Sequence, residues 1–214
     1  MSIKRPNPSK RFAHEEPDTL VYQIDDRLYV NLTDRCTLAC TFCPKHNGCT
    51  EVKGHELYLS ERPDVEQIIA LIGDPTRYAE IVFCGFGEPT LRLKDLLKVA
   101  KVVKAKGGAT RINTDGLANR VHKRDVTGDM AECIDALSIS LNAQDEVTYN
   151  KHCAPSLKGS HAEVLKFIEA AAKVIPDVSA TAIDGLEGVD VVQCAVLAEE
   201  RGAKFRARYL DAVG

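Results

Sequence analysis

From about residue 27 onward, short apolar segments with strand character alternate with segments in which apolar residues recur at helical spacing. The strand-like segments are rich in β-branched and apolar residues, and polar or glycine-containing turns follow them. We predict strands at Leu28–Thr33, Glu80–Phe86, Ala109–Thr114, Ala136–Asn142, Val178–Ile183 and Lys204–Leu210. We predict helices at Pro63–Ile72, Leu91–Ala105, Glu163–Val174 and Val191–Glu200.

This alternation favours an α/β fold with a parallel sheet and crossover helices. A complete eightfold barrel typically needs about 250 residues. A partial (β/α)6 TIM-like barrel therefore fits the 214-residue chain better. A doubly wound open sheet is the alternative that the pattern leaves open. We expect a flexible polar tail over residues 1–25 and a single domain over residues 26–214.

Composition narrows the function classes. The formal net charge is −3 and the pI is about 6.1, so we expect no large basic face for nucleic acid. No apolar run approaches the ~20 residues that span a bilayer. The N-terminal sequence MSIKRPNPSKRFAHEEPDT has no apolar segment of a signal peptide, and we expect a cytoplasmic protein.

Three of the eight cysteines form a C-x3-C-x2-C pattern, at Cys36, Cys40 and Cys43, directly after the first predicted strand. In a reducing compartment, clustered cysteines indicate metal or redox ligands. Three thiolates can bind three irons of a cubane cluster and leave the fourth iron open. The alternative is a structural zinc site completed by Cys49 or His46. Zinc sites usually pair two close-spaced couples of ligands, so we favour the cluster.

The remaining cysteines carry weaker signals. Cys133 and Cys194 lie among apolar positions and are expected in the core. Cys84 lies next to the proposed site, and Cys153 follows a polar loop beyond the fourth strand. Either could be a thiol on the substrate side, although we favour buried structural roles.

Polar and glycine-rich segments follow four consecutive predicted strands. These segments are CTLACTFCP, GFGEPT, NTDG and LN. The carboxyl ends of parallel strands meet at one edge of a sheet, where ligands bind in α/β proteins. The four segments therefore predict one site rather than scattered surface features.

The segment CTLACTFC resembles the C-x3-C-x-aromatic-C signature of radical S-adenosylmethionine (SAM) enzymes. GFGEP is similar to the glycine–glycine–glutamate motif of that family, with Phe86 at the first glycine position. The resemblance implies a [4Fe–4S] cluster held by the three cysteines, with SAM on the open iron. It also implies the partial barrel of the radical SAM type.

The same resemblance assigns the SAM contacts. The backbone near the aromatic residue would touch the adenine, and the glutamate motif would hold the amino group through charge-assisted hydrogen bonds. NTDG resembles the strand-end motif near the ribose or carboxylate, with Asp115 where relatives often have Asn. The implied cofactor-binding residues are Phe42, Gly85, Gly87, Glu88, Asn113, Thr114, Asp115, Ser140 and Asn142.

More narrowly, NLTDRCTLACTFC, IVFCGFGEPTLRL and ALSISLNAQDEVTYNKHCAP look like segments of the TatD family-associated radical SAM proteins. This implies reductive cleavage of SAM to a 5′-deoxyadenosyl radical acting on an unidentified small-molecule or protein substrate. It also implies a flavodoxin- or ferredoxin-like electron donor and a functional link to a TatD-type nuclease. No catalytic protein residue can be chosen for the later steps.

Other functions stay open at this point. Within the superfamily, the small size also suits a 7-carboxy-7-deazaguanine synthase-like or glycyl-radical-activating enzyme. Outside it, the alternative is a non-catalytic zinc or iron–sulfur protein that partners a nuclease.

Overall fold

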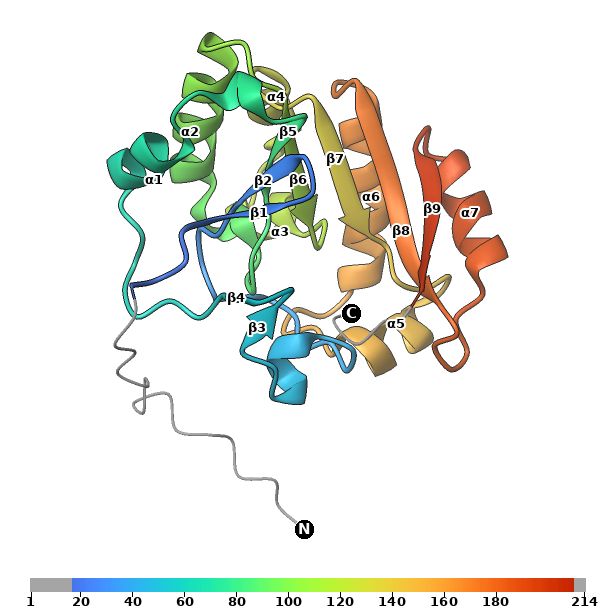
Figure 1. Cartoon of the computed structure of the whole chain (residues 1–214). Coiled ribbons are helices and arrows are strands. Elements are labelled where there is room, and N and C mark those ends of the chain that lie inside the picture. Colours follow the sequence, from blue (N-terminus) through green and yellow to red (C-terminus); the bar gives the residue numbers. More distant parts are fainter. Residues whose placement is uncertain (1–16, 210–214) are drawn as a thin grey trace.

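The computed structural model describes residues 17–209, and its centre is a seven-stranded sheet (Figure 1). The strand order is β1-β2-β5-β6-β7-β8-β9, in which β1 is antiparallel to β2 and all other neighbours are parallel. The strands are β1 Val21–Ile24, β2 Arg27–Val30, β5 Glu80–Phe83, β6 Thr110–Thr114, β7 Ala136–Ser140, β8 Asp177–Asp184 and β9 Lys204–Tyr209.

The six parallel strands follow one another in chain order, which confirms the predicted α/β class and excludes the doubly wound alternative, whose order reverses at a switch point. Because right-handed crossovers that advance in one direction place their helices on one face, the opposite face stays free (Figure 1). The sheet ends at β1 and β9, so it is a partial barrel rather than a closed one.

Seven helices and three short 3-10 turns connect the strands among the described residues. The helices are α1 Val65–Ile72, α2 Leu93–Ala105, α3 Ala118–His122, α4 Thr127–Ala131, α5 Glu146–Cys153, α6 Ser160–Ala172 and α7 Val191–Glu199. The turns are η1 Pro44–Asn47, η2 Pro75–Arg77 and η3 Pro89–Arg92. None of the helices in this part of the chain has the length and apolar character needed to cross a bilayer.

Alternation along the strands separates a packed face from a polar one. On β7, Leu137 and Ile139 are buried against the helices, whereas Ser138 and Ser140 line a cavity on the concave face. In a complete TIM barrel, apolar side chains fill the interior in layers. Here the strand side chains that line the cavity are small or polar, and the concave face is hollowed instead.

The sheet begins earlier than predicted. Val21–Ile24 lies in the segment expected to be a tail, but it pairs with β2, and the rings of Tyr22 and Tyr29 stack 5.2 Å apart. The domain boundary at residue 26 is therefore wrong for residues 17–25, because this short strand covers the edge of β2. Residues 1–16, and Leu210 of the predicted last strand, lie outside the described residues.

Two further elements carry no clear signal in the sequence. A hairpin of β3 Glu51–Val52 and β4 His55–Glu56 lies beyond the cysteine loop. Helix α5 has the polar sequence EVTYNKHC, which shows no apolar stripe. It begins where the Asp145 carboxylate accepts a hydrogen bond from the Thr148 amide at 2.9 Å. Tertiary contacts rather than periodicity define this helix.

Candidate cofactor site at the carboxyl ends of the strands

A cavity of about 270 Å³ opens on the concave face and brings together most of the residues that the motifs predicted. All the predicted cofactor-binding residues line it except Gly85. Cys36 and Cys40 also line it, whereas Cys43 does not. The lining residues are Cys36, Leu38, Cys40, Phe42, Cys84, Gly87, Glu88, Asn113, Thr114, Asp115, Ser138, Ser140, Asn142, Thr181, Arg206 and Arg208. The four strand-end segments therefore form one site.

The cysteine loop is held by the end of helix α5. The amide of Ala39 donates to the carbonyl of Cys153 at 3.0 Å, and the amide of Thr41 donates to that of His152 at 2.8 Å. The carbonyls of a last helical turn lack partners within the helix, so they are available to an adjacent loop. Ser156 extends this docking, since its amide and hydroxyl both donate to the carbonyl of Thr37, at 3.1 and 2.9 Å.

The three thiols differ in exposure. Cys36 is exposed, whereas Cys40 and Cys43 are half-buried. Cys43 caps η1, and its amide donates to the Cys40 carbonyl at 3.1 Å, which turns the loop tightly. The neighbouring Cys153 side chain, and then burial, raise the pKa of the Cys40 thiol. Cys153 is thus a buried neighbour of a predicted ligand and does not line the cavity.

Cubane clusters take each thiolate on a different iron, so the thiols need not converge on one point. Within residues 17–209, no three His, Cys, Asp or Glu side chains are grouped around a position for a single metal ion. The zinc alternative with Cys49 or His46 therefore has no assembled ligand set in this part of the chain.

Glu88 is a buried junction between two strand ends. One carboxylate oxygen accepts from the Thr90 amide at 3.0 Å, the Thr90 hydroxyl at 2.6 Å and the Thr114 hydroxyl at 2.8 Å. The other oxygen accepts from the Asp115 amide at 2.7 Å. The residue therefore ties the loop after β5 to the end of β6, in addition to lining the cavity.

Asp115 continues this network toward the cysteine loop. Its carboxylate accepts from the Leu117 amide at 2.9 Å and from the Thr37 hydroxyl. Burial, and then the neighbouring Asp115 charge, raises the pKa of Glu88 to about 8, and burial raises that of Asp115. Two carboxyl groups that share a buried site favour a bound cation, because it offsets their mutual repulsion.

Both glycines of the GFGEP segment allow close approaches. A Cβ atom on Gly87 would lie 2.3 Å from the carbonyl oxygen of Thr33 and 2.4 Å from that of Arg35. A Cβ on Gly85 would lie 2.1 Å from Oδ1 of Asn31. Gly85 thus makes room for a buried side chain outside the cavity, and Gly87 lets the two loops touch.

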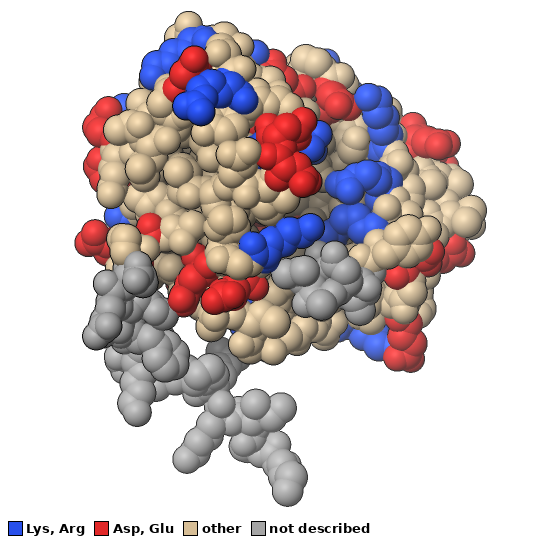
Figure 2. Space-filling model, viewed as in Figure 1, with Lys and Arg blue, Asp and Glu red and all other residues tan. Residues whose placement is uncertain are grey.

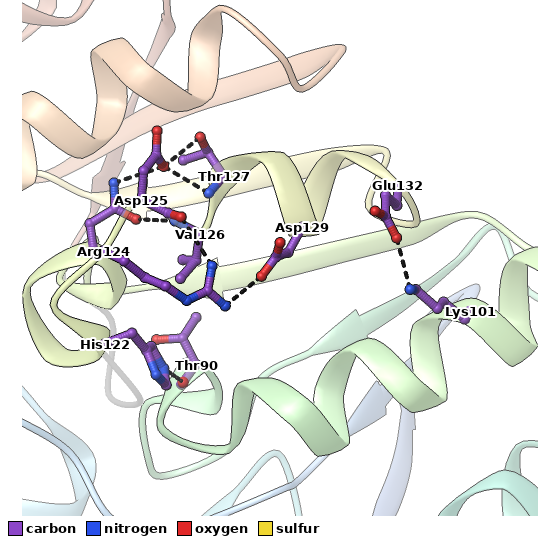
Figure 3. Close-up of polar contacts among 10 residues, drawn as sticks. Thr90, Lys101, His122, Arg124, Asp125, Val126, Thr127, Asp129 and Glu132 are labelled. Carbon is purple, nitrogen blue, oxygen red and sulfur yellow. Dashed lines mark hydrogen bonds and ion pairs between the residues drawn. The ribbon is translucent and has the colours of Figure 1, made fainter.

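His122 and Thr90 support Glu88 from outside the cavity. Figure 3 shows His122, from α3, pointing at the carbonyl of Thr90, with Nε2 and the oxygen 2.8 Å apart. Thr90 in turn donates twice to Glu88. The surrounding surface pairs, such as Arg124 with Asp129 at 2.5 Å, are exposed and contribute little.

Two buried amide oxygens have acceptor capacity left. Oδ1 of Asn113 and Oδ1 of Asn142 have no hydrogen-bond partner among the described residues. Burial raises the pKa of the Cys84 thiol, and the neighbouring Asn113 side chain lowers it in part. Nδ2 of Asn142 donates to Sγ of Cys153 at 3.3 Å. Both asparagine side chains line the cavity. A ligand with hydroxyl or amino donors would satisfy them.

These features fit the group that the sequence resemblance implies. SAM carries an ammonium, a carboxylate, a sulfonium and ribose hydroxyls. The paired carboxyls match the positive charge, and the amide oxygens match the donors. The thiols on the docked loop match the ligand set of a [4Fe–4S] cluster.

Sequence reasoning missed part of the cavity wall. Ser138, Thr181, Arg206 and Arg208 line it without belonging to any motif. The available signal was the alternation in KFRARY, which places basic residues on one face of β9 and apolar ones on the other. Alternation alone does not say which face is concave.

Two named enzymes are similar to this chain in sequence. GTP 3′,8-cyclase of Corynebacterium glutamicum is 29% identical over 187 residues, covering 84% of this chain and 47% of the cyclase. A probable dual-specificity RNA methyltransferase RlmN of Rippkaea orientalis is 28% identical over 121 residues, covering 52% of this chain and 32% of the methyltransferase. The chain thus spans about a third to a half of the length of these relatives.

Solved structures share the fold. The crystal structure of SuiB from Streptococcus suis matches with a TM-score of 0.64 at 16% identity, over 88% of this chain and 40% of that one. Methylornithine synthase (PylB) matches with a TM-score of 0.55 at 14% identity, over 86% of this chain and 53% of that one. A model of the radical SAM superfamily matches residues 30–199, most of the chain. The chain therefore belongs to the radical SAM superfamily, whose members use a [4Fe–4S] cluster and SAM.

Proposed function

We propose that this protein is an active radical SAM enzyme in which Cys36, Cys40 and Cys43 hold the [4Fe–4S] cluster. The supporting observation is that the docked cysteine loop and the Glu88–Asp115 pair open onto one cavity. When bound, the cluster and SAM would supply one-electron reductive cleavage and a 5′-deoxyadenosyl radical that takes hydrogen from the substrate.

The chain's own residues bind and orient in this proposal. Glu88 and Asp115 attract the ammonium of SAM, and Asn113 and Asn142 accept from its hydroxyl or amino groups. The backbone near Phe42 contacts the adenine. The α5 carbonyls keep the cysteine loop in place, because they hold its amides at two alternate positions.

The decisive experiment is anaerobic reconstitution with iron and sulfide, followed by addition of SAM and dithionite. We expect about four irons and four sulfides per chain and formation of 5′-deoxyadenosine. A protein that carries an intact cluster yet neither binds nor cleaves SAM would contradict the proposal. Zinc in place of iron after anaerobic purification would favour the non-catalytic metal-binding alternative.

The biological setting belongs to the same proposal. The narrower sequence similarity supports a place among the TatD family-associated radical SAM proteins, with a functional link to a TatD-type nuclease. We propose a cytoplasmic enzyme that receives its electron from a flavodoxin- or ferredoxin-like protein. SAM cleavage should continue when a reduced flavodoxin or ferredoxin replaces dithionite. Failure with both proteins would contradict the proposed type of electron donor.

The substrate is best sought by deuterium transfer into 5′-deoxyadenosine. Relatives named for GTP and for RNA match this chain, so nucleotides are the first compounds to test. The 7-carboxy-7-deazaguanine synthase-like role predicts a small heterocyclic precursor of the deazaguanine, and the glycyl-radical-activating role predicts a partner polypeptide. Deuterium in 5′-deoxyadenosine from only one of these classes would decide between them.

A further inference from the structure

Strand β9 presents an unusual row of charges to the concave face. Lys204, Arg206 and Arg208 occupy alternate positions, whereas Phe205 between them packs against the core. Arg206 pairs in register with Thr181, which also lines the cavity. Both arginines line the same cavity as the cofactor residues, and Lys204 does not. Figure 2 shows basic side chains gathered near the middle of this face.

Three other basic residues on the strands have acidic partners. Lys204 binds Asp177 at 2.8 Å. Glu80 binds Arg27 at 2.6 Å and Arg111 at 2.9 Å. These ion pairs link neighbouring strands, so the charges of these residues already have a role in the sheet.

Arg206 differs from them. Its side chain is exposed, and its recorded contact is a long one, 3.5 Å from the Ser138 hydroxyl. Within residues 17–209, no carboxylate lies at ion-pair distance from Arg206. A charged side chain that lines a cavity without an acidic partner is available to a ligand.

The two sides of the cavity carry opposite charges. The cysteine loop, Glu88 and Asp115 lie at the β2, β5 and β6 ends, and β9 lies at the far edge of the sheet. The acidic side suits the ammonium and sulfonium of SAM, whereas the basic side would repel both groups. The NTDG resemblance places the ribose or carboxylate of SAM at the end of β6, three strands away from β9. The β9 side is therefore suited to the second molecule in the reaction.

The spacing of the two arginines also restricts the chemistry of the molecule that they could bind. Residues two apart on a strand have backbones about 6.6 Å apart, so the two guanidinium groups can reach one oxyanion or two adjacent ones. Guanidinium is planar and binds phosphate or carboxylate through paired hydrogen bonds.

We propose that Arg206 and Arg208 bind an oxyanion group of a small-molecule substrate, either a phosphate or a carboxylate. This group would lie on the side of the cavity opposite Glu88 and Asp115. The identification of this oxyanion with a substrate rests on the proposed function. Oxyanion binding itself can be measured without any turnover.

The test uses the full chain with its reconstituted cluster and excess SAM. Inorganic phosphate and malonate are titrated, and thermal stabilisation gives a Kd for each. We expect one of the two anions to bind the wild type and to bind at least tenfold more weakly to Arg206→Gln and Arg208→Gln. Lys204→Gln, which removes the same charge from the same face outside the cavity, should bind like the wild type. Preference for phosphate or for malonate identifies which oxyanion the substrate carries.

Arg206→Lys keeps the charge but loses paired hydrogen bonding, so an intermediate Kd is expected. It also keeps the test valid if a glutamine variant does not fold. SAM affinity should fall far less in Arg206→Gln than oxyanion affinity does, because the proposal places SAM on the side of Glu88 and Asp115.

Absence of binding of both anions, equal binding by all variants, or an equal loss in Lys204→Gln would overturn the proposal. A matching loss of SAM affinity would also overturn it, because the arginines would then serve SAM. If SAM is never cleaved but anion binding still depends on Arg206, the proposed function fails while the oxyanion site stands.

Discussion

The two sides of the cavity are built differently. On the β5–β6 side, the carboxylates of Glu88 and Asp115 already accept hydrogen bonds from neighbouring loops. On the β9 side, Arg206 makes one long contact with a hydroxyl. On the β5–β6 side, the residues proposed to bind the cofactor also hold the fold together. On the β9 side, we expect that Arg206 can be replaced without a change in the fold.

This difference predicts two kinds of mutational effect. Changes on the β5–β6 side should alter stability and cofactor binding together, because the same atoms serve both. Changes at Arg206 should leave stability unchanged and weaken the binding of an oxyanion ligand far more than that of SAM.

The largest effect is expected for the cysteine loop. Alanine at Cys36, Cys40 or Cys43 should abolish cluster retention, measured as iron and sulfide per chain after anaerobic reconstitution. Cys43 is the sharpest case, since it does not line the cavity. The control is Cys133→Ala, which removes a buried thiol of the core and should retain the full cluster. Normal iron content in Cys43→Ala would contradict its assignment as a ligand.

Glu88→Gln keeps the shape of the side chain but places an amide donor among the donors that now point at the carboxylate. We expect SAM affinity to fall about 10- to 100-fold, the equivalent of roughly 1.5–3 kcal/mol for hydrogen bonds to a charged group. Equilibrium binding of SAM to the reconstituted protein measures this change. An unchanged Kd would show that the carboxylate serves the fold alone.

The pH dependence of stability tests the same carboxylate without cofactors. Its pKa is raised from the usual 4.5 to about 8, by burial and then by Asp115. The folded state therefore holds the proton more tightly than the unfolded state. This contribution to stability is complete below pH 4.5 and is lost as the pH rises through about 8. The Tm of the ligand-free protein should fall between about pH 5 and 9, and less so in Glu88→Gln. Equal slopes in both proteins would contradict the assignment.

Gly87→Ala should destabilise the protein by about 1–3 kcal/mol, because the new Cβ meets two backbone carbonyl oxygens of the segment before Cys36. Denaturant unfolding measures the loss, and cluster content should fall with it. Gly128→Ala is the matched control, since its Cβ meets nothing within 4 Å on helix α4. It should leave stability unchanged or raise it by up to about 1 kcal/mol.

The smallest effect is expected for His122, which contacts Thr90 rather than Glu88. His122→Ala removes the contact with the Thr90 carbonyl and should cost about 1 kcal/mol of unfolding free energy. SAM affinity should change less than about twofold, because Thr90 still donates to Glu88. Arg124→Ala, which breaks an exposed ion pair beside it, should have less effect on stability than His122→Ala.

The sequence by itself determined the succession of parallel strands and the motifs at their ends. Both are local properties: strand and helix periodicity is visible within about ten residues, and CTLACTFC and GFGEP are continuous segments. Because parallel strands end at one edge, the motifs could also be assigned to one site before their contacts were known.

Only the tertiary structure decided how that site is held and completed. The docking of the cysteine loop on α5 joins residues more than a hundred positions apart, and the polar sequence of α5 gives no periodic signal. The alternation in KFRARY marked two faces of β9, but the concave one is set by which face the helices cover. The basic side of the cavity, and with it the inferred oxyanion site, depends on that choice, which no local pattern contains.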